Sequence, residues 1–125
     1  VKEAKLGGQP ISPLVRHRLA ELAVEFEVGR WLIYRVAWVL SQGKTPNYEA
    51  ALSKICGTVF QQHLAQAASQ ILGLYGQLLE DSRWAKLRGW AAQGYLFCPG
   101  YTIMGGTSEI LRNVVATLGL GLPTT

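Results

Sequence analysis

The sequence predicts an all-α protein: a helical bundle with two long antiparallel helices, one short helix and one C-terminal helix. Two long stretches repeat apolar residues at spacings of three and four, which is the period of a helix. Residue types that start and stop helices bracket these stretches, and no pair of segments shows the alternation typical of strands. With 125 residues the chain can bury one core, and residues 1–125 are expected to be one helical domain of a larger chain.

A polar lead over residues 1–11 precedes the first long helix. Ser12 and Pro13 predict where this helix starts, because serine caps helices and proline suits the first helical position. The helix is expected to run to about Gln42, with Gly43 just beyond its end.

This first helix carries a heptad-like seam, as in an antiparallel bundle. The seam consists of Val15, Leu19, Leu22, Phe26, Gly29, Ile33, Val36 and Leu40. Gly29 is expected to let a neighbouring helix approach closely. Further apolar residues surround the second half of the helix, namely Trp31, Leu32, Tyr34 and Trp38. A helix that is apolar on nearly every side is buried on more than one face, which predicts an intersubunit or interdomain contact.

The second long helix is expected over Tyr48–Leu72, with Asn47 as its cap and Gly73 after its end. Its buried side is predicted to carry Leu52, Ile55 or Cys56, Val59, His63 and Ala67. His63 has no Asp, Ser or Cys at a spacing that would support catalysis. We interpret it as an interface histidine with a satisfied hydrogen bond, not as a ligand or general base.

Residues 77–100 are the least regular part of the sequence. A short helix is predicted over Ser82–Ala92, followed by a connection with glycines and a proline that contains Tyr95 and Phe97.

The C-terminal helix is expected to begin after the glycine pair Gly105-Gly106, which permits a sharp turn or a close approach to a ligand. Thr107 and Ser108 are N-cap types, and Glu109 lies in the first turn, where a negative charge suits the helix dipole. Such a helix start is a ready site for an anion or a polar ligand. The structural alternative is that these residues only form a well-capped terminal helix.

Composition limits the function classes. Hydrophobic residues make up 49% of the chain and charged residues 16%, which suggests that other domains or subunits cover one face. The net charge is +4, and a basic cluster at Arg83–Arg88 is interleaved with Trp84 and Trp90. This cluster suits a nucleic acid or a phosphorylated ligand, although a solvated or interface helix explains it as well.

Cys56 and Cys98 lie far apart, without CxxC spacing or a set of histidines, so we expect no metal site. No apolar run is long enough to span a bilayer and no leader peptide is evident, so a cytoplasmic location is expected.

Three segments, in order, resemble the C-terminal helical part of the acyl-CoA dehydrogenase family. They are residues 14–38, residues 49–74 with Lys54 and a Q-I-L-G-L ending, and the terminal G-T-S-E-I-L-R-N signature within residues 106–123. The resemblance implies an FAD enzyme that removes an α-proton and a β-hydride from an acyl-CoA thioester, giving the trans-2-enoyl-CoA. It also implies an electron-transfer flavoprotein as electron acceptor and a homo- or hetero-oligomer, with no nucleic-acid partner.

The resemblance assigns roles to several positions. Gln70 and Gly73 match positions that contact the flavin nucleotide, in part across a subunit interface. Thr107, Ser108 and Glu109 match the flavin-binding helix start, and Gly106 matches a backbone group that lies against the acyl-CoA. The structural alternative is that the first pair ends one helix and the second set starts another.

The sequence also departs from the family pattern. Gly105 occupies the commonest position of the catalytic glutamate, so this segment supplies no base there, and some branches place that glutamate on an earlier helix. Glu109 is not a substitute, because a cofactor contact or a cap explains it.

The R-x-x-F-G strip aligns to residues 4–8, where arginine and phenylalanine are both missing, and Leu74 replaces the second glycine of Q-I-x-G-G. These losses weigh against flavin binding by this segment alone. They resemble the actinobacterial branch whose unlike subunits pair on bulky substrates such as steroid side-chain thioesters.

Three hypotheses follow. In the first, the chain is the C-terminal domain of an active acyl-CoA dehydrogenase whose base lies elsewhere, and the isolated chain is inactive. In the second, it is a non-catalytic structural partner of a catalytic paralogue. In the third, it is a helical nucleic-acid binder that uses the Arg83–Arg88 cluster.

Overall fold

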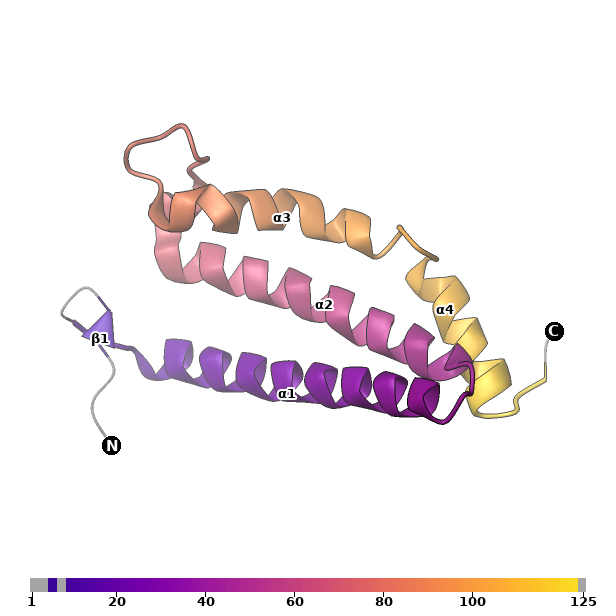
Figure 1. Cartoon of the computed structure of the whole chain (residues 1–125). Coiled ribbons are helices and arrows are strands. Elements are labelled where there is room, and N and C mark those ends of the chain that lie inside the picture. Colours follow the sequence, from indigo (N-terminus) through magenta and orange to yellow (C-terminus); the bar gives the residue numbers. More distant parts are fainter. Residues whose placement is uncertain (1–4, 7–8, 124–125) are drawn as a thin grey trace.

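A computed structural model describes residues 5–6 and 9–123 of the chain. The helices are α1 (Pro13–Ser41), α2 (Asn47–Leu72), α3 (Trp90–Tyr101) and α4 (Ser108–Val114), which continues into a π-helical turn, η3 (Val115–Gly119). Two short 3-10 segments, η1 (Gly73–Gln77) and η2 (Lys86–Gly89), lie between α2 and α3. Helix α2 lies between α1 and α3, and α4 crosses the end of the bundle where α2 begins (Figure 1).

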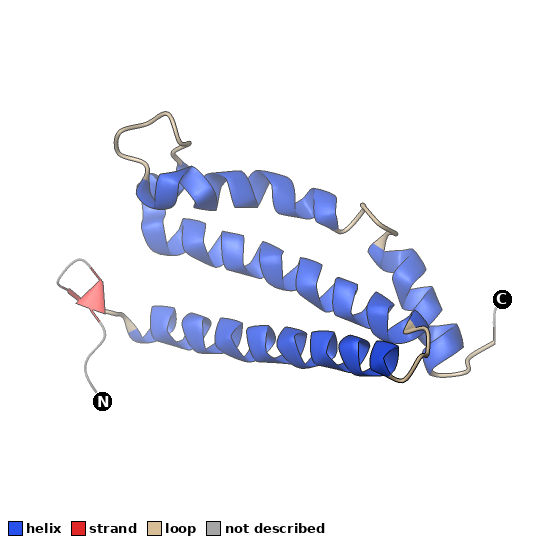
Figure 2. Cartoon of the chain, viewed as in Figure 1, coloured by secondary structure: helices blue, strands red, loops and turns tan. Residues whose placement is uncertain are grey.

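Helices dominate the described chain, so the all-α prediction is confirmed (Figure 2). The sequence did not predict the one sheet-like feature, a pair of two-residue strands, β1 (Lys5–Leu6) and β2 (Gln9–Pro10). They pair antiparallel, with Lys5 opposite Pro10.

Both ends of α1 follow the local signals in the sequence. The Ser12 hydroxyl accepts a hydrogen bond from the Val15 N–H at 3.3 Å, and Pro13 is the first helical residue. After Gln42, Gly43 takes a left-handed φ of +69°, a conformation that glycine adopts without strain. The predicted start and end of this helix are therefore confirmed.

The predicted seam on α1 is only half right. Leu22 is buried and Val15, Gly29 and Val36 are half-buried, but the other seam members are exposed: Leu19, Phe26, Ile33 and Leu40. The predicted close approach at Gly29 is wrong, because a Cβ placed there would have nothing within 4 Å. The positions that share the covered face lie one residue earlier, namely Arg18, Glu25, Leu32 and Val39. Two of these are charged, so an apolar pattern could not reveal the true stripe.

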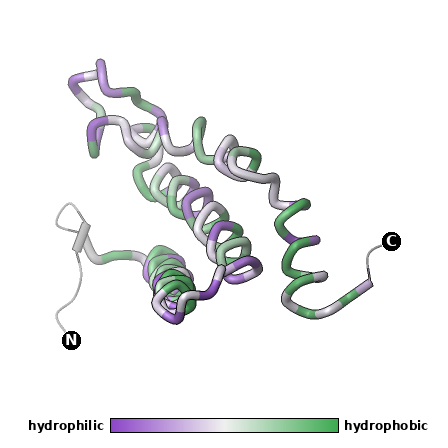
Figure 3. The backbone as a smooth tube through the Cα atoms, turned by 45° about the vertical axis from the view of Figure 1, so that its right-hand side comes forward, coloured by the Kyte–Doolittle hydropathy of each residue, from purple (hydrophilic) through white to green (hydrophobic). Residues whose placement is uncertain are grey.

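The outer side of α1 carries large apolar side chains that are exposed in this chain, although the pattern predicted a helix covered on more than one face. Trp31 is 64% exposed and Trp38 is 53% exposed. Hydrophobic positions recur around the α1 coil and along the α4 segment (Figure 3). The contact that would cover this side stays a prediction.

Helix α2 differs from its prediction at its start and in its burial. Asn47 is its first residue, Pro46 precedes it, and no side chain caps the helix. Because α1 and α3 flank α2, most of its residues are partly covered on both sides, and the buried ones are Glu49 and the alanines Ala51, Ala65 and Ala67. The predicted single buried side was therefore too simple.

The hydrogen bond expected for His63 is confirmed, while the absence of a ligand or general-base role stays a prediction. Its Nδ1 lies 2.9 Å from a carboxylate oxygen of Glu25, which joins α2 to α1.

The predicted short helix over Ser82–Ala92 is wrong. Residues 82–85 form turns, and Leu87 and Arg88 adopt left-handed φ angles of 52° and 53°, which interrupts any regular helix there. The helix lies later, at α3, where Pro99 sits near the C-terminal end. Small residues explain this placement: Ala91, Ala92 and Cys98 are buried, and a Cβ at Gly94 would lie 3.1 Å from that of Ala65 on α2. Close packing between two helices overrides the glycines that suggested a loop.

Within residues 5–6 and 9–123, no helix is both long and apolar enough to cross a membrane.

Candidate functional site

The segment between α3 and α4 forms a tight turn, Thr102–Thr107, called here the Gly-Gly turn. Gly105 has φ +67° and Gly106 has φ +99°, in the region where side-chain-bearing residues are strained. A Cβ at Gly106 would also lie 3.3 Å from a methyl of Leu111 on α4. The backbone at these positions therefore favours glycine, independently of any ligand.

The Thr102 carbonyl holds the Gly-Gly turn closed. It accepts hydrogen bonds from the backbone N–H of Ser108 at 3.0 Å and from the Ser108 hydroxyl at 3.5 Å. Ser108 is buried, with 6% exposure. Lys54 on α2 reaches the same turn, and its Nζ donates to the carbonyls of Gly106 at 2.7 Å and Thr102 at 3.4 Å.

Thr107 and Glu109 start α4 as predicted. The Thr107 hydroxyl accepts from the Ile110 N–H at 3.3 Å, which is a helix cap. The pKa of the exposed Glu109 carboxyl is lowered, first by a hydrogen bond from its own backbone N–H and then by one from the Thr107 hydroxyl. Arg112 and Lys54 lower it further by their charge. Glu109 thus carries a stable negative charge, which suits a capping or ligand-binding role better than proton abstraction.

The structure brings one predicted set of site residues together: Gly105, Gly106, Thr107, Ser108 and Glu109 are contiguous in the Gly-Gly turn and the start of α4. Lys54 joins this set and was not predicted as a site residue. Its bonds span 52 and 48 residues along the chain, so no local pattern could have assigned it to this turn.

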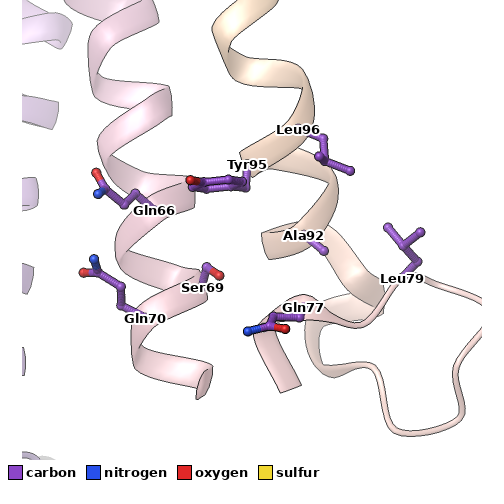
Figure 4. Close-up of a pocket in the computed structure, with 9 residues that line it drawn as sticks. Gln66, Ser69, Gln70, Gln77, Leu79, Ala92, Tyr95 and Leu96 are labelled. Carbon is purple, nitrogen blue, oxygen red and sulfur yellow. The ribbon is translucent and has the colours of Figure 1, made fainter. Parts of the chain in front are cut away.

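The other predicted pair lies at the far end of α2. Gln70 lines a groove of about 510 Å³ that α2, η1 and α3 form together. We call it the glutamine groove; its other polar lining side chains are Gln66, Ser69, Gln77 and Tyr95. Figure 4 shows Tyr95 extending from α3 toward Gln66, with Gln77 approaching from η1. Gly73 ends α2, and its N–H donates to the Gln70 carbonyl.

Sequence reasoning missed Gln66, Gln77 and Tyr95. A signal existed for Gln66, because it lies one helical turn before Gln70 on the same face of α2.

The two sets are not one compact site. Lys54 and Gln70 are sixteen residues apart on α2, which corresponds to about 24 Å along the helix. A single small ligand cannot contact both sets, whereas different parts of a long dinucleotide, or two different ligands, can.

The glutamine groove suits the neutral part of a nucleotide. Its volume lies within the range of small-molecule sites, roughly 300–1,000 Å³. Its side-chain amides and hydroxyls can donate to and accept from a base or a ribose, and none of its nine described lining residues is charged. A pyrophosphate would need cations from elsewhere. In the family that the sequence resembles, the strip aligned to residues 4–8 supports that group, but its arginine is missing here, and these residues lie largely outside the described ones.

The basic cluster at Arg83–Arg88 has partners within the chain. The Arg83 guanidinium lies 4.9 Å from the centre of the Trp84 ring, and the Lys86 ammonium lies 5.6 Å from that of Tyr75. These cations occupy ring faces on which a nucleobase would stack.

Among the described residues, no group of three or more His, Cys, Asp or Glu side chains is placed to hold a metal ion. Cys56 and Cys98 are free thiols.

Comparisons with known proteins give one consistent result. The family described as acyl-CoA dehydrogenase, C-terminal domain, matches residues 1–119. A benzylmalonyl-CoA dehydrogenase of Aromatoleum aromaticum is 31% identical over 91% of this chain and 29% of its own length. Acyl-CoA dehydrogenase IpdE1 of Mycolicibacterium smegmatis is 31% identical over 98% of this chain and 29% of its own.

Solved structures agree. The Tcur3481-Tcur3483 steroid acyl-CoA dehydrogenase superposes with a TM-score of 0.86 at 31% identity, covering 91% of this chain and 30% of that one. The ChsE4-ChsE5 complex from Mycobacterium tuberculosis gives a TM-score of 0.85 at 28% identity, covering 97% of this chain and 32% of that one. The chain therefore spans less than a third of the length of these relatives.

Proposed function

Because this chain belongs to the acyl-CoA dehydrogenase family, as a copy of its C-terminal domain, we propose that it acts within a larger flavin-dependent enzyme that oxidises an acyl-CoA thioester. In this proposal residues 1–125 form one helical domain. The domain contributes contacts to FAD and acyl-CoA and packs against other domains and subunits. The α,β-dehydrogenation uses a catalytic base from outside this segment.

The observation that carries this proposal is the Gly-Gly turn. Gly105 stands directly before Gly106-Thr107-Ser108, and its left-handed backbone suits glycine rather than glutamate. The turn is nevertheless fully built, because Ser108 closes it and Lys54 anchors it. A segment that keeps the turn without a base can position a substrate and leave proton abstraction to a carboxylate elsewhere.

Two regions would contact FAD. Thr107, Ser108 and Glu109 would lie against it at the start of α4. Gln70 and Gly73 would contact a nucleotide at the glutamine groove, where neutral donors and acceptors fit a base or a ribose. The bound flavin would supply hydride acceptance, and an electron-transfer flavoprotein would take the electrons onward. Because Lys54, which contacts the first region, lies about 24 Å along α2 from Gln70, the two regions would hold distant parts of one cofactor or cofactors of two subunits.

The full-length protein tests this proposal. We expect it to purify yellow and to lose its flavin absorbance when an acyl-CoA thioester is added. Thioesters of fatty acids, aromatic acids and steroid side chains should be compared. A colourless and inactive full-length protein, despite added FAD, would overturn the proposal.

A second function deserves a test because a specific observation favours it. Both superposed structures carry paired names, and one is described as a complex. In this chain, Leu74 replaces the second glycine of Q-I-x-G-G and is 81% exposed, beside Tyr75 and Trp84. The alternative is that the chain belongs to a non-catalytic subunit that pairs with a catalytic paralogue.

Co-expression separates the two functions. The full-length protein should be produced with paralogues encoded beside it and then resolved by size-exclusion chromatography. A stable heteromer whose activity depends only on the catalytic glutamate of the paralogue supports the partner function. An active homomer that never binds a paralogue contradicts it.

A further inference from the structure

Lys54 connects two parts of the chain that are distant in sequence. Its Nζ donates to the Gly106 carbonyl at 2.7 Å and to the Thr102 carbonyl at 3.4 Å. Both carbonyls belong to the Gly-Gly turn, while Lys54 lies in the N-terminal half of α2. These bonds therefore fix the turn against the central helix of the bundle.

The first part of the Gly-Gly turn is held by its own bonds, from the N–H groups of Ile103 and Met104 to the Gly100 carbonyl, but Gly105 and Gly106 lie beyond them. Gly105 and Gly106 can populate both signs of φ, so the turn loses more conformational freedom on ordering than other sequences would. Ser108 closes the turn at the Thr102 carbonyl. That bond shapes the loop, and the two bonds from Lys54 join it directly to α2, in addition to the packing of α3 and α4 on that helix.

The bond to Gly106 also acts on the next donor in the chain. The Gly106 carbonyl and the Thr107 N–H belong to the same planar peptide unit. An ammonium on the carbonyl fixes the orientation of that plane and polarises its N–H, which strengthens the bond that this N–H can donate. Lys54 thus controls both the direction and the strength of a backbone donor in the turn.

We propose that Lys54 is a positioning residue for the dehydrogenation proposed above, on which this inference rests. It holds the Gly-Gly turn in the orientation in which its backbone groups meet the acyl thioester. The hydrogen bonds of Lys54 go to two backbone carbonyls of the turn, so we assign it a role through the turn and not in proton or hydride transfer.

Three substitutions in the full-length holoenzyme test this role. Lys54→Met keeps the length of the side chain and removes its charge and donors. Lys54→Arg restores a cation that can donate to both carbonyls. Lys44→Met is the matched control, because Lys44 is an exposed lysine in the connection between α1 and α2.

We expect Lys54→Met to lower kcat by about tenfold or more, the effect of one lost charged hydrogen bond, with a smaller change in KM. Lys54→Arg should recover part of the loss, and Lys44→Met should stay within about twofold of wild type, as for surface substitutions in general. A residue that only stabilises the fold would lower the melting temperature without this kcat-specific loss. If Lys54→Met does not fold, Lys54→Gln keeps one neutral donor and should give an intermediate loss.

Hydrogen exchange on the same proteins separates this proposal from the proposed function. Peptides covering residues 102–110 should exchange faster in Lys54→Met than in wild type or in Lys44→Met. Unchanged exchange together with unchanged kcat overturns the role of Lys54. A wild-type protein without turnover on any acyl-CoA overturns the proposed function instead, and the exchange result then decides alone whether Lys54 anchors the turn.

Discussion

At the scale of single residues, position 105 of the Gly-Gly turn is subject to two opposing demands. Its left-handed backbone favours glycine, whereas a catalytic base would need a glutamate there. A glutamate at position 105 would bring a base, but it would have to adopt the left-handed φ of +67° seen here. Side-chain-bearing residues pay about 1–2 kcal/mol for that conformation. Glycine removes the strain and the base together.

Replacing each of the two glycines by alanine is expected to lower the free energy of unfolding by a different amount. Gly105→Ala should lower the free energy of unfolding by about 1 kcal/mol, because nothing lies within 4 Å of the added Cβ and only the backbone is strained. Gly106→Ala should cost more, since its Cβ would also press on Leu111 at 3.3 Å. Urea unfolding of the two variants and the wild type measures both effects. Equal costs would contradict the packing around Gly106.

The two cysteines predict a dependence on pH. Burial raises the pKa of the Cys56 and Cys98 thiols, so the folded state binds these protons more tightly than the unfolded state does. The free energy of unfolding should therefore fall as pH rises above the ordinary cysteine pKa of about 8.5. Unfolding of wild type and a Cys56→Ala/Cys98→Ala variant, compared at neutral and alkaline pH, isolates this contribution. A wild type that loses no more stability than the variant at alkaline pH contradicts the prediction.

At the scale of elements, α2 organises the molecule, because α1, α3 and α4 all pack against it (Figure 1). Small residues on α2 and α3 allow close approach on one side. On the other side polar bridges join α1 to α2: Glu25 to His63, and Arg35 to the buried Glu49. The position of Lys54 and Gln70 on this one rigid helix fixes the separation of the two candidate contact regions.

Burial, not distance, should decide the contribution of an ion pair here. Glu49 is 8% exposed and lies 3.4 Å from Arg35, whereas Glu27 and Arg30 are closer, at 2.7 Å, but are both about half exposed. Glu49→Gln should lower the free energy of unfolding by about 1 kcal/mol, since Arg35 then faces a neutral amide in place of a buried carboxylate. Glu27→Gln should have no measurable effect. Thermal and urea unfolding of the pair checks this, and a larger effect at Glu27 would contradict it.

Local signals explain which elements could be predicted from sequence. Ser12-Pro13, Gly43 and Thr107 each set a helix end through bonds within a few residues, so their predictions are confirmed. The covered face of α1 could not be predicted, because Arg18 and Glu25 occupy it and Glu25 finds its partner on another helix. The start of α3 could not be predicted either, because nothing local marks the left-handed Leu87 and Arg88.

Of the candidate site too, only the part set by local sequence could be predicted. Gly105 to Glu109 are neighbours in sequence and their turn could be anticipated, while Lys54 and the shape of the glutamine groove depend on contacts across the bundle.

At the scale of the whole molecule, the described chain leaves much apolar surface uncovered. The outer side of α1 exposes Trp31, Tyr34 and Trp38, and exposed apolar patches of this kind mark contacts with other proteins or domains. A domain that spans less than a third of its relatives is expected to have such a surface, because the remaining domains and subunits would cover part of it.

This surface predicts that the isolated chain associates in solution. Sedimentation velocity should show oligomers whose fraction grows with concentration, because association removes the α1 side chains from water. Trp31→Ser/Trp38→Ser should reduce the association while keeping helical circular dichroism, since both side chains are more than half exposed. Leu14→Ser is the control, because Leu14 is 82% exposed but lies at the start of α1, away from the tryptophans. A wild-type chain that stays monomeric at all concentrations would contradict this use of the surface.

The central claim is that this segment positions an acyl-CoA oxidation for which it does not supply the base. The most direct measurement is acyl-CoA-dependent loss of flavin absorbance, made side by side on the full-length protein and on residues 1–125 supplied with FAD. We expect the full-length protein to lose its flavin absorbance and the isolated chain to show no such loss. Turnover by the isolated chain would show that the base lies within it, and a full-length protein that binds no flavin and oxidises no thioester would contradict the proposed function.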